Sequence, residues 1–378
     1  MKIVVNTRLL QKGNLEGIGW FTYETFKRIT RSHPEHQFYF LFDRPYSDEF
    51  IFSENVTPLV YGPPARHPFL YYIWFEWVVP RVLKKVGADL FITPDGYSSL
   101  SAKTPILQVV HDINYAHYPQ YIPFVARKYL EIYFPKFIKK ADRIATVSEF
   151  SKQDVIKHYG YDAAKIDVVY NGANEMYGPV SDEVATLTRK QYSDGKPYFF
   201  YVGALHPRKN IINLLKAFDI FRATTKIQMK IVIVGKVYWW NDEMEKEYKK
   251  IVHKEDIVFV GRVETDVLKN LLASSLAVTY VSLFEGFGIP IVEAMYSEVP
   301  VITSNTSSMP EVGGDAALYV NPFSVDSIAD AMKDIYYNKD LRKTLVENAK
   351  IRRKEFTWDK SAERLWQSVE KLMTKTGK

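Results

Sequence analysis

The feature that most constrains this chain is a repeated alternation of short runs rich in Val, Ile and aromatic residues with longer stretches of helical periodicity. Such alternation predicts β-α-β units, and therefore parallel sheets covered by helices. In the first half of the chain we expect strands at 2–6, 37–42, 90–93, 106–112, 143–147 and 166–172. In the second half we expect strands at 198–204, 230–235, 257–261, 276–283, 300–305 and 317–320.

The length and the spacing of these runs predict two domains. The chain has 378 residues, which exceeds the usual size of a single core. The strand series pauses at 173–196, where Pro, Gly, Ser and Asp surround one short helical pattern, as is typical of a linker. We therefore expect two doubly wound α/β domains, at 1–172 and 197–355. Ligands of such sheets bind outside the carboxyl ends of the strands, so the loops that follow the strands are where we look for chemistry.

Composition narrows the class of protein. The chain has no cysteine, which removes disulfides, thiolate metal sites and thiol nucleophiles and fits a reducing compartment. The opening MKIVVNTRLL predicts a buried strand rather than a signal peptide, and no run approaches 18 uncharged apolar residues. We therefore expect a cytoplasmic protein without a membrane span. The net charge of +6 is modest and favours an anionic ligand or an anionic membrane face.

Two stretches of the first half, 69–85 and 126–143, interleave basic with aromatic residues. This pattern is typical of amphipathic helices that pack on a core and expose their lysines, and it also fits peripheral binding to an anionic membrane surface. The sequence leaves both readings open. Nucleic-acid binding is not expected, because the basic residues belong to no recognised nucleic-acid-binding module.

The stretch LFEGFGIPIVEAM at 283–295 follows an expected strand and opens a helix whose proline suits the first helical position. Gly286 and Gly288 permit unusual backbone angles and a close approach of the main chain to a ligand. The amides of a helix start favour an anion, whereas Glu285 and Glu293 suit sugar hydroxyls, which are donors. The spacing alone also fits a helix-dipole role for Glu293 and an exposed loop position for Glu285.

Basic residues follow the first strand of the second half. The stretch LHPRKN at 205–210 places Arg208 and Lys209 at the carboxyl end of that strand, where an anion site is expected. Fixed cations stabilise the charge of a leaving diphosphate without a metal, although a solvated surface pair gives the same pattern. The sequence contains no Asp-any-Asp triplet, the carboxylate pair with which some nucleotide-sugar enzymes hold a divalent cation. We therefore expect no metal.

The first strand of the chain is followed by a glycine-bearing loop that includes Gly17 and Gly19. A dinucleotide fingerprint requires a tight Gly-any-Gly-two-Gly turn, which this longer loop lacks, so a nicotinamide dehydrogenase is disfavoured. The loop fits an approach to a phosphate or a sugar, or a plain connection. His111 follows another expected strand and suits contact with a hydroxyl or a reacting sugar, or a structural role.

Together, these segments resemble glycosyltransferase family 4. FEGFGIPIVEAM resembles the family's motif of two Glu separated by seven residues, and GIGWFTYE, VVHDINYAHYP, ADRIATVSEFSKQDV, VVYNGAN and VGALHPRKN resemble further family segments. The resemblance runs from about residue 2 to residue 370. It implies two Rossmann-like domains facing a cleft (the GT-B fold), with a last helix at 356–378 that completes the first domain. It also implies a nucleotide-sugar donor, retention of anomeric configuration, and neither a cofactor nor a required metal.

The resemblance assigns roles to the site residues. Lys209 matches the family lysine on the diphosphate, with Arg208 beside it, and His111 matches the histidine near the reacting sugar. Many members carry an arginine directly after the strand glycine, where this chain has Ala204, so Arg208 is expected to substitute. The resemblance thus gives catalytic roles to Glu285, His111, Lys209 and Arg208, and donor-binding roles to Gly17, Gly19, Gly203, Gly286, Phe287, Gly288 and Glu293.

Two of these segments, VGALHPRKN and VVHDINYAHYP, look most like bacterial mannosyltransferases that build surface polysaccharides. This implies hexosyl transfer from GDP-mannose, with a UDP-hexose as the alternative donor, to a glycan or lipid-linked glycan held by the first domain. The expected location is the cytoplasm, with possible peripheral contact at the inner face of the membrane. A non-catalytic protein that binds a nucleotide or a glycan is the alternative from a different class.

Overall fold

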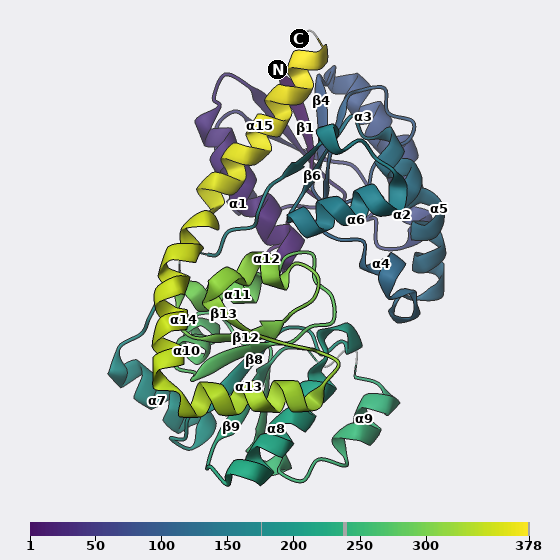
Figure 1. The fold of residues 1–378 in the computed structure, drawn as a ribbon. Helices are drawn as coiled ribbons and strands as arrows, with labels where there is room; N and C mark the ends of the chain where they lie inside the picture. The colour runs from purple at the N-terminus through teal and green to yellow at the C-terminus, as the bar shows by residue number, and fades with distance from the viewer. Residues whose placement is uncertain (175, 237–239, 377–378) are drawn as a thin grey trace. The chain divides into compact units, whose positions relative to one another are not determined.

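The computed structural model describes residues 1–174, 176–236 and 240–376 (Figure 1). The chain divides into two compact units: unit 1 comprises Met1–Gly172 and Thr357–Lys378, and unit 2 comprises Ala173–Phe356. The segment 173–196, expected to be a linker, therefore lies within unit 2, and its Glu175 is outside the described residues. Helix α7 (Asp182–Ser193) anchors the segment, since Arg189 donates to the backbone carbonyl of Ser274.

Unit 1 is built on a seven-stranded parallel sheet in the order β3-β2-β1-β4-β5-β6-β7. Every strand expected from the sequence is present, although β5, β6 and β7 end earlier than expected. The sequence analysis missed β3, because Pro58 lies in its middle; proline cannot donate to a ladder and is tolerated here because β3 is an edge strand. The strands are β1 (Lys2–Asn6), β2 (Gln37–Phe42), β3 (Val56–Val60), β4 (Leu90–Thr93), β5 (Ile106–Val110), β6 (Arg143–Thr146) and β7 (Ile166–Val168).

The helices of unit 1 include one from the far end of the chain. The last helix, expected at 356–378, is observed as α15 (Trp358–Thr376), and residues 377–378 lie outside the described residues. It lies beside α1, where Arg28 pairs with Asp359 (Figure 1). The other helices of unit 1 are α1 (Gly17–Ser32), α2 (Pro68–Ile73), a π-helical segment (Trp74–Val78), α3 (Val79–Val86), α4 (Asn114–His117), α5 (Phe124–Lys140) and α6 (Glu149–Tyr159).

Unit 2 is built on a six-stranded parallel sheet in the order β10-β9-β8-β11-β12-β13, and each of its strands was expected. They are β8 (Tyr198–Val202), β9 (Lys230–Val234), β10 (Ile257–Gly261), β11 (Ala277–Tyr280), β12 (Val301–Ser304) and β13 (Ala317–Val320). Its helices besides α7 are α8 (Ile211–Thr225), α9 (Asp242–Tyr248), α10 (Thr265–Ala273), α11 (Ile289–Tyr296), α12 (Met309–Gly313), α13 (Val325–Tyr337) and α14 (Lys339–Arg352).

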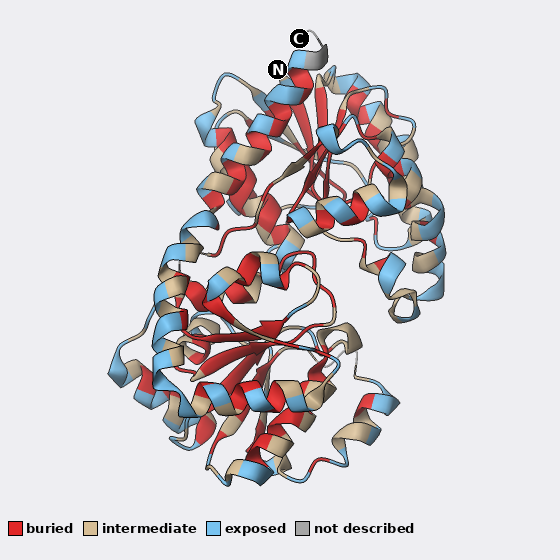
Figure 2. Ribbon diagram, in the orientation of Figure 1, coloured by how far each residue is buried: buried red, intermediate tan, exposed pale blue. Residues whose placement is uncertain are grey.

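Hydrophobic burial holds these layers together. All four residues of β11 and of β12 are buried, as expected for parallel strands covered by helices on both faces (Figure 2). Helix α8 places buried residues at 211, 214, 215, 218 and 221, which is the spacing of one helical face. In the described part of the chain, none of the helices is both long and apolar enough to cross a bilayer.

The strand orders define where a ligand site belongs in each unit. In unit 1 the order reverses between β1 and β4, and in unit 2 it reverses between β8 and β11. Parallel α/β sheets bind ligands at such switch points, outside the carboxyl ends of the two strands. The loops after β1 and β4, and after β8 and β11, are therefore the candidate sites.

A close contact between two glycines shapes the loop after β8. A Cβ atom on Gly235 would lie 1.8 Å from the carbonyl oxygen of Gly203, a distance that no side chain can occupy. Gly203 opens the loop that carries Arg208 and Lys209, so this contact fixes where that loop leaves the sheet.

We expect Gly235→Ala to lower the free energy of unfolding by about 1–3 kcal/mol, because the added methyl group forces the backbone of Gly203 to move. Urea unfolding followed by circular dichroism measures this change. Gly178→Ala is the control, because a Cβ atom there meets nothing within 4 Å. Equal stability of Gly235→Ala and the native chain would contradict the close contact.

Candidate active site

A buried cluster of two cations and one carboxylate lies at the switch point of unit 2. Lys209 Nζ is 2.5 Å from Glu285 Oε1, and Arg208 Nη1 is 3.2 Å from Glu285 Oε2. Lys209 Nζ also donates to the Tyr280 hydroxyl at 2.8 Å. The three charged side chains are at most 15% exposed. The structure therefore brings together three of the residues that the sequence analysis selected, from loops 76 residues apart.

Local hydrogen bonds fix the conformation of the loop after β8. His206 Nδ1 accepts from the amide of Arg208, which starts the short 3₁₀ turn Pro207–Lys209. Asn210 follows with a φ of 61° and donates from its buried side chain to the carbonyl of Val281. The amide of Leu283 in turn donates to the carbonyl of Arg208 at 2.9 Å. The two loops of the switch point are thus joined by their backbones, which holds the charged side chains in register.

The charges of the cluster determine its protonation. Burial on its own would raise the pKa of Glu285, but the charges of Lys209 and Arg208 outweigh it and lower that pKa to about 2. The carboxylate is therefore ionised at neutral pH. Burial and the Glu285 carboxylate raise the pKa of Tyr280 well above its usual value, so its hydroxyl stays neutral. With two cations and one anion, the cluster carries one net positive charge in a site shielded from water.

The segment between the cluster and α11 is held by hydroxyl groups. Ser308 Oγ donates to the carbonyls of Glu285 and Phe287, at 3.0 and 2.8 Å, and Ser307 Oγ accepts from the amide of Glu285. Gly288, which precedes α11, has a φ of 105°, a left-handed conformation that favours glycine. These contacts fix the main chain from Glu285 to Gly288, which includes Gly286 and Phe287, at the carboxyl edge of the sheet.

Glu293 lies in a different environment from Glu285. It is the fifth residue of α11, partly buried, and its carboxylate is hydrogen-bonded by Tyr177. Burial raises the pKa of Glu293 to about 7, and the bond from Tyr177 only partly opposes this rise. The sequence analysis missed Tyr177, which lies in the segment expected to be a linker, where the surrounding Pro and Gly gave no signal of a buried side chain.

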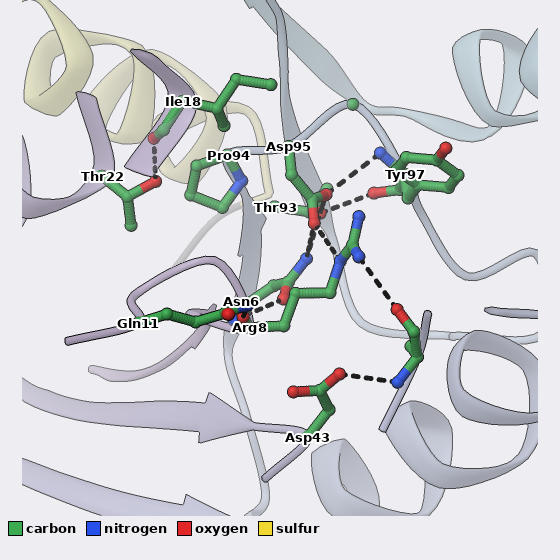
Figure 3. Close-up of polar contacts among 12 residues, drawn as sticks. Asn6, Arg8, Gln11, Ile18, Thr22, Asp43, Thr93, Pro94, Asp95 and Tyr97 are labelled. Carbon is green, nitrogen blue, oxygen red and sulfur yellow. Dashed lines mark hydrogen bonds and ion pairs between the residues drawn. The ribbon is translucent and has the colours of Figure 1, made fainter. Parts of the chain in front are cut away.

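The switch point of unit 1 holds a second buried ion pair, also missed by the sequence analysis (Figure 3). Arg8 Nε lies 2.5 Å from Asp95 Oδ2, and Asn6 donates to the same carboxylate oxygen at 2.9 Å. The Arg8 guanidinium lies 5.1 Å from the ring centroid of Tyr71 and 4.9 Å from that of Tyr97. The sequence did contain a signal for this pair, since Arg8 and Asp95 each come two positions after an expected strand.

His111 lies in the same unit, directly after β5. Its Nε2 is 2.9 Å from the carbonyl oxygen of Pro94, and a carbonyl can only accept, so this nitrogen carries the proton and Nδ1 is the acceptor. Burial lowers the pKa of His111. The ring is therefore a neutral imidazole that can accept a hydrogen bond from a hydroxyl. Its orientation is fixed further by the edge of Phe21, at 5.1 Å between ring centroids.

The remaining predicted positions occupy the starts of loops and helices. Gly17 is the exposed first residue of α1, and Gly19 is buried two positions later, where a Cβ atom would meet the carbonyl of Leu9 at 3.1 Å. Gly203 directly follows β8. The structure thus places Arg208, Lys209, Gly203, Glu285 to Gly288 and Glu293 in unit 2, and His111, Gly17 and Gly19 in unit 1.

Comparison with known proteins identifies the class. Residues 186–352 match the family model described as glycosyl transferases group 1, and residues 16–175 match that of glycosyltransferase family 4. The chain is 31% identical over 250 residues to O-antigen chain mannosyltransferase B of Escherichia coli, covering 66% of each chain. It is 30% identical over 268 residues to O-antigen chain mannosyltransferase RfbU of Salmonella typhimurium, covering 71% of each. The chain belongs to glycosyltransferase family 4.

Solved structures agree with the fold. The complex of Anabaena HepE with UDP and glucose superposes with a TM-score of 0.76 at 18% identity, covering 98% of this chain and 99% of that one. WaaG, a glycosyltransferase involved in lipopolysaccharide biosynthesis, gives a TM-score of 0.74 at 14% identity, covering 97% and 99%. The two parallel sheets are therefore those of the GT-B fold expected from the sequence.

Glu285 and Glu293 should make the free energy of unfolding depend on pH in opposite directions. The folded pKa of Glu293, about 7, lies above the ordinary value of 4.5, so its contribution to stability is present below pH 4.5 and is lost as the pH rises through 7. In the native chain we expect the free energy of unfolding to fall by about 3 kcal/mol between pH 4.5 and 7, since each pKa unit is worth about 1.4 kcal/mol. Glu293→Gln should abolish this fall. Urea unfolding at a series of pH values measures it.

Glu285→Gln is the matched comparison. The folded pKa of Glu285, about 2, lies below 4.5, so its contribution is present above pH 4.5 and is lost as the pH falls toward 2. This variant should change how the free energy of unfolding depends on pH below 4.5, and it should leave the dependence between pH 4.5 and 7 as in the native chain. Identical profiles for the two variants would show that the carboxylates do not differ in this way.

Proposed function

We propose that this chain transfers a hexosyl group, with retention of anomeric configuration, from a nucleoside diphosphate sugar to a hydroxyl of a glycan or lipid-linked glycan. The observation that carries the proposal is the cluster of Lys209, Arg208 and Glu285 at the switch point of unit 2. Its excess positive charge suits a diphosphate, and its ionised carboxylate suits the hydroxyls of the attached sugar.

The charges of the cluster match the course of the transfer. The bond between the anomeric carbon and the diphosphate oxygen breaks, and its electron pair stays on that oxygen, next to Lys209 and Arg208. The acceptor oxygen bonds to the anomeric carbon on the same face, and its proton passes to the departing phosphate oxygen. Side-chain cations therefore supply the stabilisation, and the proposal assigns no metal and no further cofactor to the step.

The remaining site residues extend this assignment. Glu293, hydrogen-bonded by Tyr177 at the start of unit 2, is proposed to accept from the ribose hydroxyls of the nucleotide. The main chain at Gly203, Gly286 and Gly288 is proposed to approach the sugar and the diphosphate, where a side chain would intrude. Unit 1 is proposed to hold the acceptor, with Nδ1 of the neutral His111 accepting from a sugar hydroxyl, and with Gly17 and Gly19 bordering the phosphates.

GDP-mannose is the proposed donor. It is supported by the names of the two relatives at about 30% identity, both O-antigen mannosyltransferases. A UDP-hexose is the second candidate, supported by the complex of Anabaena HepE with UDP-glucose. The product is proposed to be part of a surface polysaccharide.

We expect Lys209→Ala and Glu285→Ala each to lower transfer from GDP-mannose by about 100-fold or more, the loss typical of removing one group that stabilises transition-state charge. The assay measures formation of mannosylated acceptor and release of GDP. Lys216→Ala is the control, because Lys216 pairs with Glu247 on the surface of the same unit.

Thermal unfolding separates loss of chemistry from loss of fold. GDP, UDP and ADP are tested for stabilisation of the native chain, and GDP is expected to raise its melting temperature the most. If Glu285→Ala does not fold, Glu285→Gln takes its place. Full activity in either folded variant would remove the assignment, whereas binding of GDP-mannose without turnover would favour a non-catalytic binding protein.

An exposed apolar surface on unit 1 supports peripheral membrane contact. We define this surface by Phe69, Trp77, Phe124, Val125 and Ile132, each more than half exposed, on the helices between 68 and 78 and on α5. Trp74 and Phe75 of the π-helical segment and Phe134 and Phe137 of α5 are buried, which confirms the core-packing reading, whereas membrane contact stays a proposal. Lys128 lies on the same stripe of α5 as Phe124 and Ile132, four residues from each. Lys128 also pairs with Glu131, and we propose that these apolar side chains and Lys128 together contact an anionic lipid surface at the inner face of the membrane.

We expect the chain to float with vesicles that contain phosphatidylglycerol at low salt, and to bind less at high salt because charge screening weakens the lysine contribution. The double variant Phe124→Ser, Ile132→Ser should lose most of the binding. Phe323→Ser in unit 2 is the control, since Phe323 is equally exposed at 65%. Absence of the native chain from the floating fraction would indicate an acceptor taken from solution.

A further inference from the structure

Three metal-ligating side chains converge on unit 1, and none of them is assigned to the transfer reaction. His117 ends α4, and Asp154 and His158 lie one turn apart on α6. His117 Nε2 is 2.8 Å and 3.0 Å from the two carboxylate oxygens of Asp154. His158 Nδ1 is 3.1 Å from Asp154 Oδ1 and 3.1 Å from the Asp154 carbonyl oxygen, so it carries a proton that a bound ion would replace. In the described ranges of the chain, this is the single group of three His, Asp or Glu residues whose ligating atoms lie close enough to share an ion, all within 4.8 Å.

The burial of the cluster suits an ion more than a surface ion pair. Asp154 is 8% exposed, whereas the imidazoles of His117 and His158 are about 30% exposed. A buried carboxylate therefore faces two imidazoles that reach the solvent, which leaves room for water as a further ligand. The spacing of four residues between Asp154 and His158 places both on one face of α6.

The donor set selects the class of metal. Two imidazole nitrogens and one carboxylate oxygen suit Zn²⁺, whereas Mg²⁺ and Ca²⁺ prefer oxygen ligands throughout. Tetrahedral zinc with bonds of about 2.0–2.1 Å holds its donors roughly 3.3 Å apart. The imidazole nitrogens lie 2.8 to 3.1 Å from the Asp154 carboxylate, and all three donor atoms lie within 4.8 Å of one another, so modest side-chain shifts bring them to this geometry.

The position of the cluster suggests what an ion would do. His117 ends the segment that begins after β5 with His111, and Ser151 of α6 already donates to the carbonyl of His111 at 3.0 Å. An ion held by His117 together with α6 would fasten this segment to α6 at a second point. We propose that His117, Asp154 and His158 form a Zn²⁺ site, completed by water, which stabilises the His111 segment of unit 1.

Titration with Co²⁺ tests the site. The full chain, freed of any affinity tag and treated with EDTA, should develop the visible absorption of four-coordinate Co²⁺ that saturates at one equivalent and is displaced by Zn²⁺. Zn²⁺ should also raise the melting temperature, because an ion that binds the folded state alone stabilises it. His117→Ala and His158→Ala should each weaken binding by at least about 100-fold, beyond the 10–100-fold typical of residues that only support a ligand.

His253→Ala is the matched control. His253 Nδ1 lies 2.7 Å from Asp219 Oδ1 in unit 2, outside the proposed site, and the variant should bind Co²⁺ as the native chain does. Asp154→Asn keeps a hydrogen-bond acceptor for the imidazoles and should still lose the ion, which separates a metal site from a hydrogen-bonded cluster. Failure to saturate, or affinities unchanged in both histidine variants, would overturn the proposal, and neither outcome bears on the transfer activity.

Discussion

The ion pair between Lys209 and Glu285 is the interaction on which the site of unit 2 depends. Burying an unpaired carboxylate or ammonium group costs several kcal/mol, so each charge is tolerated because the other lies 2.5 Å away. The pairing requires β8 and β11 to be neighbours, which the crossover order of the sheet provides. Arg208 then adds a second cation that the carboxylate cannot neutralise. The result is a shielded positive site that holds its geometry before any ligand arrives.

Unit 1 repeats this arrangement with a different outcome. Arg8 and Asp95 also come from the two loops of a switch point, but they form a pair of one cation and one anion enclosed by the rings of Tyr71 and Tyr97. The charge of Arg8 is balanced locally, and the pair ties the loop after β1 to the loop after β4. The carbonyl of Pro94, in that second loop, orients His111. Unit 1 therefore presents a neutral imidazole where unit 2 presents a net positive charge, which supports the proposal that unit 2 binds the diphosphate.

Most of the fold could be predicted because buried parallel strands leave a strong signal. β11 and β12 are buried on both faces, and their Val- and Ile-containing runs stand out against the helical periodicity around them. β3 could not be predicted, because an edge strand needs fewer apolar residues and can contain Pro58. The expected linker was assigned from its Pro and Gly content, which describes local conformation and gives no information on whether Tyr177 and Ala185 are buried by residues far along the chain.

The sequence by itself determined the alternation of strands and helices, the glycines at the loops and the types of charged residue at strand ends, because each depends on neighbours within a few positions. Only the tertiary structure decided which of these charges meet. Strand order brings Glu285 to Lys209 and Arg208, whose charges lower its pKa to about 2, whereas burial raises the pKa of Glu293 to about 7. Two acids of one motif thus acquire pKa values shifted in opposite directions, because burial and charge partners depend on the tertiary structure rather than on spacing along the chain.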